Sequence, residues 1–442
     1  MKAGPVGVAA PLVVLIAAMS IGCAAPQASA APVALRLQVS LTAEELADFR
    51  PALERVDAAH PEFTVALEEV PQGSEVEKVT TQLAADDLPD LLRVQGLNVQ
   101  QWIRRGAFLD LTSRATTAGL DLTDFYEGPL DQFRFNDGLW GVPDTASPEV
   151  VFINRTMFQA AGIDEPTDDW TYDEMRAAAI TLTIDEGGRH PGDAGFDPDS
   201  IVQWGWNGGI TYFWQNALVK ARGGDLCANK DCTQMNFTSA ANQAALGWWA
   251  SLVRDDHAAL YDPYGGSQTG VEGDPFLSGK AAMGSNGAFA IGQLNAAGSI
   301  DYDIIPPLVG VDGQRYTPLS TNGYAISAHS DHPDEAMALL NALVAKDFLE
   351  TTWAATGHAV PARRSAAAAV IDTDRAPANQ EAILTAMESG AVFRPSTAHA
   401  FDAYAATAAL FTKMNTGELE VDEALLQIEA AANKALEPDR SP

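Results

Sequence analysis

Aromatic side chains gather in one short stretch of this chain. Residues 204–214 read WGWNGGITYFW, so five of these eleven positions are aromatic in a chain whose aromatic content is 8%. Aromatic rings offer flat faces to the C–H groups of sugars, and indole N–H and phenol O–H groups can bond hydroxyls. The stretch therefore indicates a sugar-stacking surface, with packing of a helix start into the core as the alternative. Its glycines and Asn207 predict irregular backbone before Thr211.

No motif for covalent chemistry accompanies these rings. The chain has no HExxH motif and no nucleophile elbow. Gly279-Lys280 resembles the end of a phosphate-binding loop, but Asp274 and Ala281 stand where that loop needs Gly and Ser or Thr. We therefore predict a protein that is not an enzyme, without metal or cofactor. The 59 acidic residues leave a carboxylate pair for glycoside hydrolysis open as an alternative.

Two cysteines lie close together in a polar segment. Cys227 and Cys232 enclose Ala-Asn-Lys-Asp. In an oxidising compartment such an even pair predicts a disulfide that closes a small structural loop. A metal site would need further Cys or His ligands nearby, and the sequence has none close to this pair.

The N-terminus indicates export. Lys2 precedes an apolar run, residues 6–21, that is too short for a comfortable bilayer span and typical of a secretory signal. Cys23 follows almost directly and looks like the lipid-attachment site of bacterial lipoproteins, although Ser20-Ile21 departs from the usual residues. Cleavage after Ala30 is the alternative and would release a soluble protein. We expect a signal peptide over 1–22, a tether over 23–33 and an extracytoplasmic protein held on the cell membrane by its N-terminal lipid only.

The net charge and the length of the chain limit its possible binding partners and its architecture. The formal net charge of −32 argues against binding to nucleic acid and against unaided binding to anionic lipid. A chain of 442 residues is long for a single compact core. Its length predicts two lobes of roughly 200 residues each.

Strand and helix patterns alternate along the chain. Strands are predicted at 34–40, 63–67 and 88–95, with a capping box at Thr42–Glu45 and a helix cap at Ser74–Glu77 between them. A second capping box stands at Thr171–Glu174. The later segments are strands at 149–154, 281–285, 302–305 and 323–327, and helices at 238–253, 334–345, 378–389, 398–414 and 421–436. This order predicts an α/β fold with helices on the faces of a parallel sheet.

The order of several segments resembles a known family. The segments are DLPDLL at 87–92, GLWGVP at 138–143, VFIN at 151–154, FQAAG at 158–162, WTYDE at 170–174, FLSGKAAM at 276–283, NGAF at 286–289 and GHAVPAR at 357–363. Together they resemble the extracellular solute-binding proteins of ABC importers, in the maltose-binding-like carbohydrate branch. The resemblance implies an α/β, two-lobed periplasmic-binding-protein-like fold with a hinge and an interlobe cleft. The lobes would comprise 34–145 plus 317–365 and 146–316 plus 366–442.

The resemblance also implies function. Such a protein would capture a carbohydrate as a monomer by lobe closure and deliver it to an ABC transporter permease. The ligand-binding candidates are Gln95, Asn98, Asp144, Trp206, Tyr212, Trp214, Asn286, Phe289, Asn322, Arg394 and Asp402. Phe289 would be a stacking ring, whereas Val94 stands where some members place one.

Departures from the family pattern bear on the ligand. Asp402 stands where a maltose binder has tryptophan, which makes maltose doubtful. With Asp144 and the negative net charge, it favours an amino sugar. One alternative is a receptor for a non-sugar solute such as a glycerophosphodiester, for which Arg394, Arg363 and Arg364 could supply cations. A secreted glycoside-active enzyme is the other alternative.

Overall fold

The computed structural model describes residues 1–4, 7, 31–208, 212–261, 274–392, 397 and 399–440. The predicted signal segment and Cys23 lie outside these residues. Among the described residues, no helix combines the length and apolar character that a membrane span needs.

Residues 33–95 build a parallel three-stranded unit. β1 (Val33–Val39) pairs in parallel with β2 (Phe63–Glu69) and β3 (Leu91–Gln95). Helices α1 (Ala43–Ala59) and α2 (Glu75–Ala84) connect these strands. The capping box predicted before α1 is confirmed, because Thr42 Oγ1 accepts from the Glu45 amide and the Glu45 carboxylate accepts from the Thr42 amide. The cap predicted at Ser74–Glu77 is wrong, because Ser74 precedes α2 but its side chain makes no capping hydrogen bond.

Two long strands carry the sheet across the molecule. β6 (Val142–Asn154) and β12 (Tyr316–Ile326) pair antiparallel from Leu319 opposite Pro148 to Tyr324 opposite Val142. They lie at the centre of one continuous sheet of order β2-β1-β3-β12-β6-β10-β8-β7. The sheet is therefore mixed, and the predicted strands at 149–154 and 323–327 are only parts of these crossing strands.

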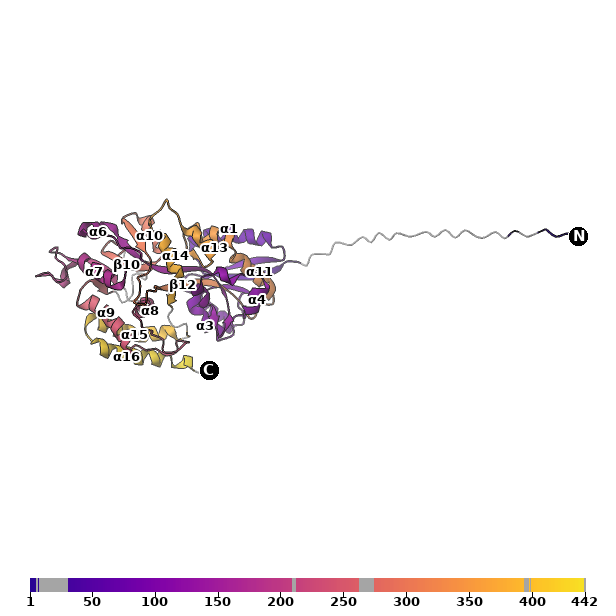
Figure 1. Ribbon diagram of the computed structural model, residues 1–442. Helices are drawn as coiled ribbons and strands as arrows, with labels where there is room; N and C mark the ends of the chain where they lie inside the picture. The colour runs from indigo at the N-terminus through magenta and orange to yellow at the C-terminus, as the bar shows by residue number, and fades with distance from the viewer. Residues whose placement is uncertain are drawn as a thin grey trace.

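The remaining strands belong to this sheet, except for β4 and β5, which pair as a separate two-stranded sheet, and the remaining helices pack around them (Figure 1). The strands are β4 (Arg134–Phe135), β5 (Gly138–Leu139), β7 (Ile184–Asp185), β8 (Ile201–Gly208), β9 (Ala259–Tyr261), β10 (Ala281–Gly287), β11 (Tyr302–Ile305), β13 (Val360–Pro361) and β14 (Gly390–Val392). The helices are α3 (Gly96–Ile103), α4 (Thr112–Thr117), α5 (Glu127–Asp131), α6 (Arg155–Ala161), α7 (Tyr172–Leu182), α8 (Tyr212–Ala221), α9 (Ala240–Arg254), α10 (Ala290–Ala297), α11 (Pro333–Leu343), α12 (Lys346–Leu349), α13 (Arg364–Ala367), α14 (Glu381–Glu388), α15 (Ala400–Thr416) and α16 (Val421–Ala435).

Three of the buried hydrophobic clusters divide between two lobes, and a fourth joins Tyr126 and Val360 to Phe152 and Ile304 and so bridges them. The largest buried cluster draws only on residues between 35 and 142 and between 324 and 366, and we call the part around it the first lobe. A second cluster draws on 151–308, and a further one joins 219–246 to 403–436; we call this part the second lobe. In Figure 1, α1, α4 and α11 lie at one end of the molecule and α6, α7 and α9 at the other. The residue boundaries given above for the lobes stay a prediction.

The aromatic stretch begins as a regular strand, which corrects the prediction of irregular backbone before Thr211. Trp204 and Trp206 lie in β8, opposite Ala281 and Met283 of β10. An added Cβ on Gly205 would lie 1.9 Å from the carbonyl oxygen of Ala179 in α7. Gly205 therefore marks a close approach of helix and strand rather than a break in the strand.

Candidate ligand-binding site

A large cavity is lined by both lobes. It measures about 1260 Å³, and its walls come from residues 100–139 of the first lobe and 216–232 of the second. We call it the hairpin cavity, because the turn between β4 and β5 lines it. Its charged lining residues are Asp131, Arg134, Asp137, Lys220, Asp225, Lys230 and Asp231. Both signs of charge therefore face this space.

The hairpin is a tight turn that is tied to the following chain. Asn136 and Asp137 join β4 to β5 as a two-residue loop, and both have positive φ, of 48° and 62°. Two positive φ values are typical of the type I′ turn, whose twist matches that of the paired strands. Trp140 Nε1 donates to the Phe135 carbonyl at 3.0 Å and ties the turn to the following chain. The half-buried Phe135 ring has the Arg104 guanidinium 4.7 Å from its centroid.

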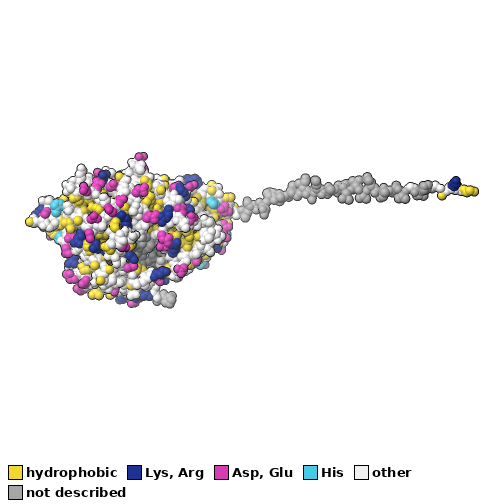
Figure 2. All heavy atoms as spheres, in the orientation of Figure 1, with side chains coloured by type: hydrophobic (Ala, Val, Ile, Leu, Met, Phe, Trp, Pro, Cys, Tyr) yellow, Lys and Arg dark blue, Asp and Glu magenta, His cyan; other side chains and the backbone are white. Residues whose placement is uncertain are grey.

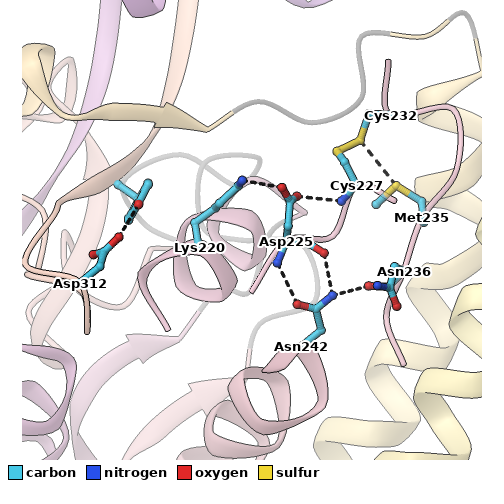
Figure 3. Close-up of polar contacts among 9 residues, drawn as sticks. Lys220, Asp225, Cys227, Cys232, Met235, Asn236, Asn242 and Asp312 are labelled. Atoms are coloured by element: carbon cyan, nitrogen blue, oxygen red, sulfur yellow. Dashed lines mark hydrogen bonds and ion pairs between the residues drawn. A yellow bond between two sulfur atoms is a disulfide. The ribbon is translucent and has the colours of Figure 1, made fainter. Parts of the chain in front are cut away.

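The opposite wall is the loop closed by the Cys227–Cys232 disulfide, which confirms the predicted pairing. Figure 3 shows how its base is held. Asp225 accepts from Lys220 Nζ at 2.5 Å and from the Cys227 amide at 2.9 Å. Asn242 of α9 donates to the Asp225 carbonyl at 2.7 Å and accepts from the Asp225 amide at 2.9 Å. The base is therefore fixed to α8 and α9, while the tip at 228–231 is exposed.

A second cavity, of about 960 Å³, lies around Phe289, and we call it the Phe289 cavity. Phe289 and Asn295 line it from the α10 segment, and residues 354–360 and 369–383 supply other walls. The Phe289 ring lies over Gly287, where an added Cβ would be 2.3 Å from the ring atom Cε1. It is 46% exposed. The ring face is thus available to a ligand, as a stacking role needs.

A buried ion pair lies where β3 meets the crossing strands. Arg93 Nε donates to Asp144 Oδ2 at 2.6 Å, and Arg93 Nη2 donates to Thr145 Oγ1 at 2.9 Å. The guanidinium also lies 4.6 Å from the centroid of the Trp353 ring. The Asp144 carboxylate is fully buried and already bonded, so we leave it out of the ligand-contacting set.

Two half-buried carboxyl groups have raised pKa values. Burial raises the pKa of Glu75 to about 7, although the Gln95 amide donates to it at 3.2 Å. Burial also raises the pKa of Glu149 to about 7, opposed by the Ser285 hydroxyl, which donates to it at 2.8 Å. Desolvation penalises the charged form in both cases. Glu149 lies in β6 beside the β12 crossing, and Glu75 begins α2 near the end of β3.

The structure brings some of the predicted ligand residues together. Gln95 lies opposite Asn322 across β3 and β12, and Asn98 Nδ2 donates to Gln95 Oε1 at a long 3.4 Å. Asn286 lies three residues before Phe289, and its side chain donates to Asp274 at 3.3 Å. Asp402 is exposed in the first turn of α15.

Other predicted residues are placed differently or not described. Trp206 is 1% exposed and packs in the second-lobe core, so we drop it from the ligand-contacting set. Tyr212 and Trp214 begin α8, but their side chains lie outside the described part of the chain. Arg394 also lies outside it.

Sequence reasoning predicted none of the residues that line the hairpin cavity as ligand contacts. The signal for the hairpin was present, because Asn136-Asp137-Gly138 is a typical turn sequence between two strands. No local sequence signal indicated that this turn lies opposite the disulfide loop.

Acidic and basic side chains are interspersed over the face of the molecule that Figure 2 shows, so on that face the negative net charge does not gather into one patch.

Comparison with known proteins identifies similar chains. A family model described as bacterial extracellular solute-binding protein matches residues 52–381. A Brucella abortus (strain 2308) protein named as a binding protein is 25% identical over 353 residues, which cover 76% of this chain and 77% of that protein. A multiple sugar-binding protein of Streptococcus mutans is 26% identical over 118 residues, only 26% of each chain.

Solved structures share the fold across nearly the whole chain. UspC of M. tuberculosis has a TM-score of 0.77 at 22% identity, covering 91% of this chain and 100% of that one. The cyclic alpha-maltosyl-1,6-maltose binding protein of Arthrobacter globiformis has a TM-score of 0.76 at 21% identity, covering 92% and 100%. The sugar-binding protein MalE of Xanthomonas citri has a TM-score of 0.76 at 17% identity, covering 92% and 98%. These likenesses show the two-lobed solute-binding fold.

Proposed function

This chain belongs to the family of bacterial extracellular solute-binding proteins, and from that membership we propose that it captures a carbohydrate between its lobes and delivers it to an ABC transporter permease. The observation that carries the proposal is the placement of the two cavities. The hairpin cavity has walls from both lobes, and the Phe289 cavity offers an exposed ring. A ligand that contacts both lobes better when they are closed shifts the protein toward closure.

The available side chains support a sugar. Phe289 offers a ring face to its cavity. Gln95, Asn322 and Asp402, which are not among the described lining residues of either cavity, carry amide and carboxylate groups that can bond hydroxyls. Three solved relatives are named for sugars: cycloalternan, cyclic alpha-maltosyl-1,6-maltose and alpha-D-tagatose. Within the carbohydrate class we propose an amino sugar, because the exposed carboxylate of Asp402 could pair with an ammonium group.

A phosphodiester ligand has less support from the described residues. Arg363 is paired with Asp124 at 2.6 Å and also donates to the Val344 carbonyl. Arg364 is paired with Glu388. Both guanidinium groups are therefore already engaged, and no observation favours this alternative.

A thermal-shift panel tests the proposal. Neutral monosaccharides, oligosaccharides, amino sugars, polyols and glycerophosphodiesters are added to the purified protein. We expect at least one saccharide to raise the melting temperature, because a ligand that binds only the folded state stabilises it. A response to the phosphodiester alone, or to no saccharide, would overturn the carbohydrate proposal.

We also propose that Cys23 carries the lipid that holds the protein on the membrane. Replacing Cys23 with Ser should then move the protein from the membrane fraction to the medium. Release of the unaltered protein, with its N-terminus at Ala31, would support cleavage after Ala30 instead.

A further inference from the structure

Asp274 is a buried carboxylate that joins three segments of the chain, and it is only 2% exposed. Its Oδ1 accepts from the amides of Phe276 and Leu277 at 2.8 and 3.1 Å. The same oxygen accepts from Asn207 Nδ2 of β8 at 2.9 Å, and Oδ2 accepts from Asn286 Nδ2 of β10 at 3.3 Å. Burial of a carboxylate is costly unless hydrogen bonds replace its hydration. These four donors therefore make the buried position of Asp274 possible.

The turn that follows Asp274 is anchored in the core. Phe276 and Leu277 are 3% and 6% exposed and belong to the buried cluster that also contains Ala290, the first residue of α10. The centroid of the Phe276 ring lies 5.8 Å from that of Phe152 in β6. The carboxylate is thus attached to a well-packed part of the protein, and it holds the side chains that it bonds in a fixed place.

The Asn286 amide connects Asp274 to the segment before Phe289. Its Nδ2 donates to Asp274, and its Oδ1 accepts from the Gly287 amide at 2.8 Å. Only one orientation of the amide places a donor against the carboxylate and an acceptor against the N–H group. Both ends of the Asn286 side chain are therefore engaged within the protein.

Phe289 rests on the residue that Asn286 bonds. An added Cβ on Gly287 would lie 2.3 and 2.6 Å from Cε1 and Cδ1 of the Phe289 ring, so the ring lies directly against the Gly287 backbone. The ring is 46% exposed. A ring exposed to this extent is held by fewer neighbours than a ring in the core, so its orientation depends strongly on the Gly287 backbone.

From these contacts we infer that Asp274 is a positioning residue, which holds the Phe289 ring in place by fixing Asn286 and, through it, Gly287. The same carboxylate bonds Asn207, so it also ties the neighbouring strand β8 to this segment. A ring that is in position before binding loses less conformational freedom when a ligand arrives. The importance of the ring for binding rests on the proposed carbohydrate function, whereas the positioning of the ring does not.

Reciprocal substitutions test the contact between Asp274 and Asn286. Asp274→Asn keeps an oxygen for the three donors on Oδ1 but sets an amide nitrogen against Asn286 Nδ2, donor against donor. Asn286→Asp sets two carboxylates against each other. The double variant Asp274→Asn/Asn286→Asp exchanges donor and acceptor, so it restores one hydrogen bond between the two side chains. Asn286→Ala, which introduces no opposing charge, replaces Asn286→Asp if that single variant does not fold.

Asp185→Asn is the matched control. Asp185, at the end of β7, is also a buried carboxylate of the second lobe, and it accepts from the Arg189 side chain and the Asp197 amide. These bonds stay within the loop 185–197. Urea unfolding of all variants is measured in parallel, because a loss of stability alone should also appear in Asp185→Asn.

Fluorine NMR observes the ring directly in ligand-free protein that carries p-fluorophenylalanine in place of Phe289. Each single substitution at Asp274 or Asn286 should shift the signal by more than its width or split it. The double variant should return the signal toward its original position, and Asp185→Asn should leave it unchanged. A signal that the single substitutions do not move, or that the double variant does not restore, would overturn the inference, and so would an equal shift in Asp185→Asn.

Addition of glucose, glucosamine or maltotetraose to the fluorinated protein separates this inference from the proposed function. A saccharide that stacks on the ring should shift the signal and should bind Asp274→Asn about two- to tenfold more weakly than the unaltered protein. Equal affinity of the two proteins for such a saccharide would overturn the role of Asp274 in the site. If no saccharide shifts the signal while the reciprocal substitutions do, the positioning role stands and the carbohydrate proposal loses support.

Discussion

Arg93 and Asp144 form an ion pair with 2.6 Å between Nε and Oδ2, and their side chains are 6% and 0% exposed. Arg93 comes from β3 of the first lobe, and Asp144 from the start of the crossing strand β6. The pair therefore ties the start of β6 to β3, whose carboxyl end carries Gln95 and leads to Asn98. Its role is to position this end of β3 rather than to bind ligand.

Replacing Asp144 with Asn should strongly destabilise the protein. The variant leaves a guanidinium buried without its counter-charge, and losing one partner of a buried pair costs about 3–5 kcal/mol. Urea unfolding measures the loss. Glu165→Gln, which breaks the half-exposed Arg155–Glu165 pair, is the matched control and should cost less than about 1 kcal/mol. Similar losses in the two variants would contradict the structural role of Arg93–Asp144.

The stability contribution of Glu149 should depend on pH. Its pKa is about 7 in the folded protein, against an ordinary value of 4.5. Between these values the folded state binds more protons than the unfolded state, so this group lowers stability as pH rises from about 4.5 to 7. Glu149→Gln should therefore be more stable than the unaltered protein at pH 8, by about 3 kcal/mol. The difference should vanish near pH 4.5; an equal difference at both pH values would contradict the assignment.

Removing the disulfide should lower stability moderately. It closes a loop of only a few residues, for which the loss of unfolded-state entropy corresponds to about 2 kcal/mol. Cys227→Ala/Cys232→Ala should show that loss in calorimetric melting. Reductant should lower the melting temperature of the unaltered protein similarly and should not affect the variant. A variant that melts like the oxidised protein would show that the Asp225 and Asn242 contacts hold the loop alone.

Phe289→Ala should weaken carbohydrate binding without unfolding the protein, because the ring is 46% exposed. Loss of a stacking ring corresponds to a roughly two- to tenfold higher dissociation constant. Phe289→Tyr keeps the ring and should bind nearly as well as the unaltered protein. Unchanged affinity in the alanine variant would remove Phe289 from the site.

Asp402→Asn distinguishes an amino sugar from a neutral one. The exposed carboxylate should attract an ammonium group modestly, so the variant should weaken glucosamine roughly two- to fivefold more than glucose. The difference should shrink at high salt, because salt screens exposed charges. Equal weakening of the two sugars at low salt would reject the amino-sugar proposal.

Local signals determined much of the fold. Capping boxes at Thr42–Glu45 and Thr171–Glu174 marked helix starts that the structure confirms. The alternation of strands and helices indicated the α/β class, and the spacing of Cys227 and Cys232 indicated their bond. These features depend on residues within a few positions of one another, so a single sequence is enough to read them.

Features that depend on packing between residues far apart in the sequence could not be predicted from local sequence signals. The strand β12 runs through Pro318 and Gly323, residues that weaken a strand pattern, because β6 pairs with it along most of its length. Trp206 lies in the aromatic stretch that we predicted to stack on sugars. It is buried in the structure, where α7 packs closely against β8 at Gly205. Burial is decided by the neighbours of a side chain, and those neighbours are far away in the chain.

The sequence by itself determined many of the helices and strands, the disulfide and the family resemblance, because each depends on short-range spacing or on the order of segments. Only the tertiary structure decided which polar groups face a cavity. Arg93 and Asp144 are 51 residues apart and neutralise each other, whereas the Asn136-Asp137 turn and the disulfide loop come from different lobes and line one space. The free energy of burying a charge or exposing a ring depends on its surroundings in space, and folding brings those surroundings together.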